Sequence, residues 1–174
     1  YPLCTSDNHV SSCPNLSTGR TTPLKTRADV ASLGGFGLEL DPKKLTKEEN
    51  AELHGYIARQ KELRALIAEG DVYRLKDPFS GNEFCMEILS KDRKAAYAVW
   101  VNFLAAANPP PMRLRFRGLD RDSYYCVEET GQKLKGDVLM NVGLPLPLPY
   151  GDFISKTFTL KVCPDGAEEG KNEH

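Results

Sequence analysis

The sequence has no excess of either charge and no long apolar run. Its 174 residues include 23 Lys and Arg against 24 Asp and Glu, so the formal net charge is −1. Nucleic acids and anionic membranes select strongly basic surfaces, and we therefore expect neither as the main partner. No apolar stretch reaches the roughly 18–20 residues of a membrane-spanning helix. The 40% hydrophobic and 27% charged residues are typical of a globular chain.

Cysteines are few and do not form a recognisable pattern. Their number is odd, their spacings are long, and no C-x-x-C occurs; they are Cys4, Cys13, Cys85, Cys126 and Cys163. This spacing favours neither a zinc site nor a small disulfide scaffold. We therefore predict dispersed reduced thiols in a cytoplasmic protein, with no metal and no cofactor.

The segment before residue 70 has helical character. Pro23 opens a predicted helix over about 24–33, which Gly34 and Gly35 end. The apolar stripe expected on this short helix consists of Leu24, Ala28, Val30 and Ala31.

A second helix is predicted over about 47–69. Thr46 and Glu49 have the spacing of a capping box, in which each side chain accepts the other residue's backbone N–H. Gly70 is expected to end the helix in a left-handed conformation. Apolar residues at steps of three and four define one face, which comprises Leu53, Tyr56, Ile57, Leu63, Leu66 and Ile67.

After Gly70 the hydrophobic period changes from 3.6 to 2. Short strands are predicted over 71–75, 84–89, 97–103, 112–116, 123–128 and 154–162. This spacing is typical of an antiparallel β-sandwich over 71–163, and the polar residues 164–174 are expected to form a flexible tail. Arg113, Arg115 and Arg117 alternate with apolar residues, which favours a solvated outer face over a polyanion site.

Residues 1–22 fit neither part, and they resemble the end of a further domain. Tyr1 stands where a complete chain has Met, so we expect a processed terminus or a piece of a longer protein. Asp7, His9 and either Ser11 or Ser12 could be written as a catalytic triad, but no strand–turn–helix G-x-S-x-G surrounds the serine. Two residues, Asp7 and His9, are too few to indicate a metal site.

Two further features could contribute to binding. Trp100 and Tyr124 could form a sugar-stacking platform, although aromatic residues in strands more often belong to the core. The alternating Leu-Pro run over 144–149 favours an extended edge connection, because proline lacks the N–H that a sheet interior requires.

Several motifs together resemble the microbial α-galactosidases of glycoside hydrolase family 36. The residues 9–31, HVSSCPNLSTGRTTPLKTRADVA, are similar to that family's HVS-x-x-PN-x-x-TGR-x-TPL-x-TR-x-DVA. In the same order follow GFGLELD at 35–41, GDVYRL at 70–75, GLD at 118–120 and LMNVGL at 139–144. The resemblance extends over nearly the whole chain.

The resemblance implies an α+β fragment made of two parts. Residues 1–70 would be the C-terminal strand and helices of a catalytic (β/α)₈ barrel, which is incomplete here. Residues 71–163 would be the C-terminal β-sandwich. The boundary agrees with the change of hydrophobic period at Gly70.

The resemblance also implies retaining hydrolysis of terminal α-galactosides, of the melibiose or raffinose type, by two aspartates. The family's K-W-D nucleophile motif is absent, and both catalytic carboxylates are expected upstream of residue 1. Thr5-Ser6-Asp7-Asn8 echoes the acid/base motif, but its position directly before His9 differs from the family pattern.

We therefore expect Asp7 at the end of the last barrel strand, with Asp7 and His9 at the rim of the galactose pocket. The fragment itself is predicted to be catalytically inactive, and the full-length protein to be a homo-oligomer that binds a galactoside. A carbohydrate-binding or structural packing sandwich without a catalytic role is the alternative, and transfer of galactosyl groups is a third possibility.

Overall fold

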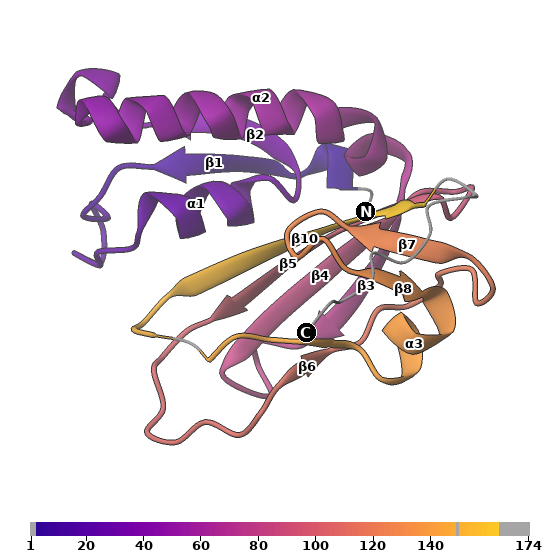
Figure 1. Cartoon of the computed structure of the whole chain (residues 1–174). Coiled ribbons are helices and arrows are strands. Elements are labelled where there is room, and N and C mark those ends of the chain that lie inside the picture. The colour runs from indigo at the N-terminus through magenta and orange to yellow at the C-terminus, as the bar shows by residue number, and fades with distance from the viewer. Residues whose placement is uncertain (1–2, 149, 164–174) are drawn as a thin grey trace, which may run out of the picture.

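A six-stranded antiparallel sheet lies at the centre of the computed structural model, which describes residues 3–148 and 150–163 (Figure 1). In spatial order its strands are β3 (Asp71–Lys76), β4 (Glu83–Leu89), β5 (Ala95–Asn102), β10 (Ile154–Val162), β7 (Tyr124–Val127) and β8 (Lys133–Lys135). The strands predicted over 71–75, 84–89, 97–103, 123–128 and 154–162 are confirmed, with shifts of one or two residues at their ends.

Two parallel strands and two helices precede this sheet. The elements are η1 (Leu3–Thr5), β1 (Asp7–Ser11), α1 (Leu24–Ala31), β2 (Gly35–Glu39), η2 (Pro42–Lys44) and α2 (Lys47–Glu69). β1 and β2 pair in parallel, with Asp7 opposite Gly35 and Ser11 opposite Glu39. β1 is not among the strands predicted from periodicity, because its polar residues hide the alternation: only Val10 is fully buried.

α2 confirms the second predicted helix. Thr46 caps it, and both hydrogen bonds of the capping box are present, Glu49 N to Thr46 Oγ1 at 3.1 Å and Thr46 N to Glu49 Oε2 at 2.9 Å. Leu53, Leu63 and Ile67 are buried on the predicted face. The predicted face therefore directs this helix onto the rest of the chain.

Gly70 ends α2 for a different reason than predicted. Its φ of −68° and ψ of 158° are extended, so the expected left-handed conformation was wrong. A Cβ atom at this position would lie 2.5 Å from Leu66 O and 2.6 Å from Ile88 Cγ2. Glycine is therefore required because backbone and sheet approach each other closely where α2 leads into β3.

α1 is shorter than predicted and presents a narrower stripe. Leu24, Ala28 and Ala31 are buried, whereas Val30 is 41% exposed. Val30 follows Ala28 by two positions, about 200° around a helix, so these two side chains face different sides of α1. The expectation that Val30 belongs to the buried stripe was wrong.

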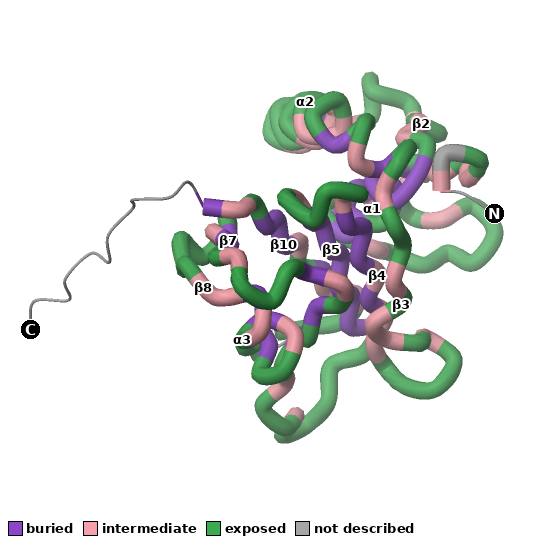
Figure 2. The backbone as a smooth tube through the Cα atoms, turned by 90° about the vertical axis from the view of Figure 1, so that its right-hand side faces the viewer, coloured by how far each residue is buried: buried purple, intermediate pink, exposed green. Residues whose placement is uncertain are grey.

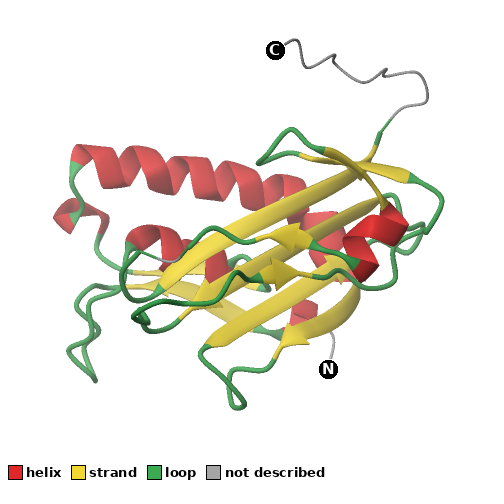
Figure 3. Ribbon diagram, turned by 60° about the horizontal axis from the view of Figure 1, so that its bottom comes forward, coloured by secondary structure: helices red, strands yellow, loops and turns green. Residues whose placement is uncertain are grey.

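Two cores lie on the two faces of the six-stranded sheet. On one face, α1 and α2 pack over the strands, and Leu63 and Ile67 of α2 contact Ile88, Tyr97 and Val99 (Figures 1 and 3). On the other face the sheet is covered by α3 (Gly136–Asn141) and by the two-stranded ribbon of β6 (Arg113–Leu114) and β9 (Leu144–Pro145). The strands between these layers form the buried centre of the molecule (Figure 2).

The strand predicted over 112–116 is reduced to β6, although its alternation is retained. Leu114 and Phe116 are buried, and Arg113, Arg115 and Arg117 are exposed. The Leu-Pro run pairs with β6 only through β9, as an extended connection. The second layer on this face is therefore a ribbon and a short helix rather than a full second sheet.

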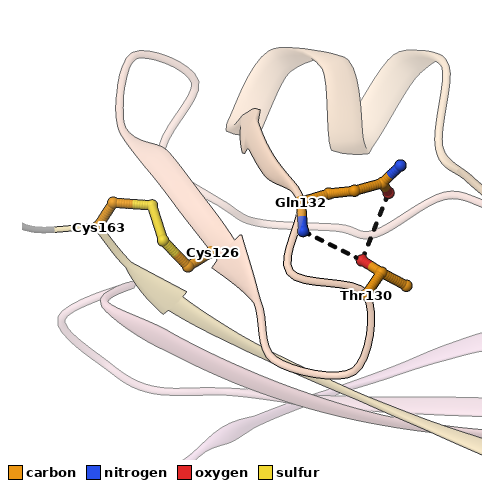
Figure 4. The surroundings of a disulfide bond; sticks show 4 residues. All are labelled: Cys126, Thr130, Gln132 and Cys163. Carbon is orange, nitrogen blue, oxygen red and sulfur yellow. Dashed lines mark hydrogen bonds between the residues drawn. A yellow bond between two sulfur atoms is a disulfide. The ribbon is translucent and has the colours of Figure 1, made fainter. Parts of the chain in front are cut away.

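A disulfide corrects the expectation of reduced thiols. Cys126 on β7 and Cys163, directly after β10, are joined with a Cα–Cα distance of 5.5 Å (Figure 4). Because β7 and β10 are antiparallel neighbours, residues 37 apart in sequence meet across the strand pair. Cys13 and Cys85 are free thiols; Cys13 is exposed and Cys85 is buried.

Among the described residues, no helix is long and apolar enough to cross a membrane.

Candidate functional site

The polar face of the β1–β2 pair gathers the candidate residues of the N-terminal segment. Side chains alternate along a strand, so Asp7, His9 and Ser11 share one face and Val10 points to the other. Val10 is fully buried in a cluster with Leu24 and Ala28 of α1. Packing of Val10 on α1 therefore turns Asp7 and His9 away from the helices.

His9 is oriented by a carboxylate on the neighbouring strand. Its Nε2 lies 2.7 Å from Glu39 Oε2, and both side chains are largely accessible, at 47% and 72% exposure. Gly37 is opposite His9 in the register, and a Cβ there would lie 3.4 Å from His9 Cβ. The absence of a side chain at Gly37 leaves room for the imidazole beside β2. Glu39 could not be assigned this role from the sequence, because it depends on the parallel register.

Asp7 lies at the start of β1 and not at the end of a strand, which corrects the expected placement. In the register it is opposite Gly35, four residues before Glu39, a distance of about 13 Å along the strand. Paired carboxylates in retaining glycosidases are only about 5–5.5 Å apart. Asp7 and Glu39 therefore do not form a catalytic pair with each other.

The segment after β1 folds into an ordered polar loop. Asn15 Oδ1 accepts hydrogen bonds from the backbone N–H groups of Ser17 and Thr18, at 3.1 and 3.0 Å. The Arg27 guanidinium donates from Nη1 to Ser11 O and from Nε to Thr22 O, which holds both ends of the loop. Local hydrogen bonds of this kind replace the missing hydrophobic contacts.

A polar hollow of about 220 Å³ lies where β1 runs into this loop. Its lining includes Ser11, Asn15, Arg20 and Arg27, which supply hydroxyl, amide and guanidinium groups. Such groups can donate hydrogen bonds to the hydroxyl groups of a sugar. Arg27 was not singled out from the sequence, since only the fold brings it back to Ser11. Within the described residues no group of three or more His, Cys, Asp or Glu could hold a metal ion.

The two aromatic candidates lie in different environments. Trp100 on β5 has no exposed surface, and its Nε1 donates to Glu83 Oε1 at 2.8 Å. Trp100 therefore belongs to the core, because a sugar cannot reach a fully buried ring. Tyr124 on β7 is 51% exposed, with Lys133 Nζ 5.3 Å from its ring centroid. The structure does not bring the two aromatic side chains into one platform.

Family models match both parts of the chain. Residues 1–70 match the Melibiase model, and residues 83–160 match the glycosyl hydrolase family 36 C-terminal domain. The parallel β1–β2 pair and the antiparallel sheet thus correspond to two segments of one class of enzyme, the glycoside hydrolases.

Similar proteins agree with these matches. The chain is 42% identical over 161 residues to alpha-galactosidase AgaA of Geobacillus stearothermophilus, covering 92% of this chain and 22% of the relative. It is 37% identical over 147 residues to the bifunctional alpha-galactosidase/sucrose kinase AgaSK of Mediterraneibacter gnavus, covering 84% and 16%.

Solved structures give the same result. The crystal structure of a Geobacillus stearothermophilus AgaA variant in complex with raffinose superposes with a TM-score of 0.91 at 41% identity, over 94% of this chain and 23% of that one. The alpha-galactosidase from Lactobacillus brevis superposes with a TM-score of 0.90 at 32% identity, over 100% and 24%. The chain belongs to glycoside hydrolase family 36, and it spans about a fifth of the length of the relatives it matches.

Proposed function

We propose that this chain is the C-terminal part of a retaining α-galactosidase that removes terminal α-linked galactose from melibiose- or raffinose-type sugars. Residues 1–70 would close the (β/α)₈ barrel, and residues 71–163 would form the C-terminal β-sandwich. The observation that carries this proposal is the β1–α1–β2 unit, whose strands bury one face against helices and leave the other face polar. A barrel strand needs this division between a helix-facing side and an inner side.

In this proposal His9 lies at the rim of the galactoside pocket, whereas Asp7, at the start of β1, lies toward the opposite end of the strand from that rim. Glu39 holds the His9 imidazole in one orientation, and the hollow near Arg27 offers donors to sugar hydroxyls. The nucleophile and the acid/base would come from a part of the polypeptide outside these 174 residues. The chain alone would then bind or position but not hydrolyse.

The test is a graft into a characterised relative. The matching segment of Geobacillus stearothermophilus AgaA is replaced by this chain, and hydrolysis of an aryl α-galactoside is measured. We expect an active chimera, while the isolated chain shows no turnover above background. A folded but inactive chimera, or robust turnover by the isolated chain, would contradict the proposal.

His9 gives the sharper readout within the chimera. His9→Ala is expected to lower kcat/KM about tenfold, a loss of about 1.4 kcal/mol in transition-state binding. The matched control, His54→Ala on the exposed side of α2, should leave kcat/KM unchanged. Equal effects of both substitutions on kcat/KM would contradict the placement of His9 at the pocket rim.

Carbohydrate binding by the antiparallel part is the second candidate, and the exposure of Tyr124 favours it. Titration with galactosides should then give saturable heat that Tyr124→Ala abolishes. Absence of heat at millimolar sugar would instead favour a structural packing role.

Assembly of the full-length enzyme into a homo-oligomer stays a prediction. A cytoplasmic location also stays a prediction, and the Cys126–Cys163 disulfide speaks against it, because such bonds are rare in the reducing cytosol.

A further inference from the structure

A cationic groove lies beside β3, the edge strand of the six-stranded sheet. It has a volume of about 630 Å³, and four basic residues line it: Lys76, Arg113, Arg115 and Arg117. No acidic residue is among its lining residues, although the chain as a whole has a net charge of −1. The positive charge is therefore concentrated here and not a property of the whole surface.

Three of the four cations form no salt bridge within the described part of the chain. Lys76 pairs with Glu83 at 3.1 Å, and Arg113 Nη1 donates to the carbonyl of Gly143 at 3.0 Å. No salt bridge is formed by the guanidinium groups of Arg115 and Arg117 in residues 3–148 and 150–163. Apart from an electrostatic interaction of Arg117 with the buried Glu87 carboxyl, their charges are available to a ligand.

The three arginines alternate with two buried residues. Leu114 and Phe116, 0% and 1% exposed, anchor the segment in the core beneath the ribbon. In an extended segment alternate side chains are about 6.6–6.8 Å apart on one face. Alternate side chains of a second extended polypeptide have the same spacing, so carboxylates at every second position could meet Arg113, Arg115 and Arg117 in turn.

The opposite wall of the groove determines how such a segment can be held. β3 has a register irregularity between Arg74 and Lys76, and Leu75 between them lines the groove. A bulge interrupts the ladder and hinders the addition of another strand to the sheet edge. Recognition would then rest on side chains, with Leu75 and Met140 as apolar contacts and the arginines as carboxylate ligands.

We propose that this groove binds an extended acidic segment of a partner polypeptide, with carboxylates at alternate positions. Arginine matches a carboxylate with two parallel hydrogen bonds, which gives the groove both its charge selectivity and its register. Long-range attraction would speed association and make it dependent on salt.

The test is fluorescence anisotropy with labelled octapeptides and the 174-residue chain. The probe alternates Glu with Val, and two control peptides carry Gln in place of Glu or the same residues as a block of four Glu and a block of four Val. We expect saturable binding of the alternating Glu peptide, at least tenfold weaker binding of both controls, and weakening with added salt.

Paired charge reversals locate the binding site. Arg115→Glu with Arg117→Glu should weaken binding at least tenfold, whereas Lys61→Glu with Arg64→Glu, on the exposed side of α2, should not. Both pairs change the net charge equally, and circular dichroism checks that each variant is folded. The proposal is overturned by absence of binding, by equal losses in both pairs, or by equal binding of the block peptide. Tighter binding of heparin or DNA at the same residues would also overturn it in favour of a general polyanion surface.

Discussion

Ser155 on β10 donates a 2.6 Å hydrogen bond to the carboxylate of Asp29 on α1, across 126 positions of sequence. Both residues are almost fully buried, at 2% and 4% exposure. Lys25 adds a salt bridge to the same carboxylate, and Thr26 Oγ1 donates to Phe153 O at 2.6 Å. A polar network therefore attaches the β1–α1–β2 unit to the antiparallel sheet, where a hydrophobic contact alone would fix no orientation.

Asp29→Ala is expected to lower the free energy of unfolding by about 2–3 kcal/mol, because a charged hydrogen-bond partner is lost and Ser155 is left buried without it. Ser155→Ala should cost about 1 kcal/mol. Urea denaturation of both variants and of the double variant gives their coupling energy. Effects that add within about 0.5 kcal/mol would show that the two side chains do not act together.

The two glycines of the α2 region should respond oppositely to alanine. Gly70→Ala is expected to destabilise the protein by about 2 kcal/mol or more, because the new Cβ meets Leu66 O and Ile88 and forces a backbone shift. Gly55→Ala, inside α2 with nothing within 4 Å of its Cβ, should stabilise by about 0.5–1 kcal/mol. Thermal denaturation measures both, and a neutral Gly70→Ala would show that α2 and β4 can move apart.

Reduction of the Cys126–Cys163 disulfide should lower the free energy of unfolding by about 3–4 kcal/mol, since the bond closes a 37-residue span in the unfolded chain. Cys126→Ser with Cys163→Ser should match the reduced protein and lose its response to reductant. Cys13→Ser, at an exposed free thiol, is the control and should behave as the unsubstituted chain. Unchanged denaturation midpoints with and without reductant would exclude a stabilising bond.

Glu87 on β4 should make stability fall as pH rises. Burial raises the pKa of Glu87 to about 8, and only Glu87 Oε2 has a partner, the backbone N–H of Arg117 at 2.8 Å. Between the ordinary carboxyl pKa of 4.5 and about 8 the folded state holds a proton that the unfolded state has released. The contribution of Glu87 to the free energy of unfolding is therefore complete below about pH 4.5, and it is lost as the pH rises from there through about 8.

Glu87→Gln removes this titration and should flatten the pH slope. Urea denaturation at pH 5, 7 and 9 measures the free energy of unfolding of both proteins. Between pH 5 and pH 9 the free energy of unfolding of Glu87→Gln is expected to rise by a few kcal/mol relative to that of the unsubstituted chain, because one pKa unit corresponds to about 1.4 kcal/mol. Glu69→Gln, exposed at the end of α2, is the matched control. Parallel pH profiles of Glu87→Gln and the unsubstituted chain would contradict the prediction.

Elements with strong local patterns could be predicted well. The capping box and the apolar face of α2 lie within one continuous segment, and β4, β5 and β10 are long enough to show their apolar character. β1 and β2 have five residues each and mostly polar or glycine side chains, so their pairing follows from α1 and not from alternation. The family motifs over 9–41 marked this segment as functional without showing that it contains two strands.

Local sequence patterns were sufficient to predict α1 and α2, the change to antiparallel strands at Gly70, and the family, because each depends on residues close together in the chain, whereas α3 was not predicted. The three-dimensional structure was needed to show that Glu39 orients His9, that Asp29 bonds to Ser155, that Cys126 pairs with Cys163, and that Trp100 is buried. Each of these relationships depends on register or packing between segments that local propensity does not specify.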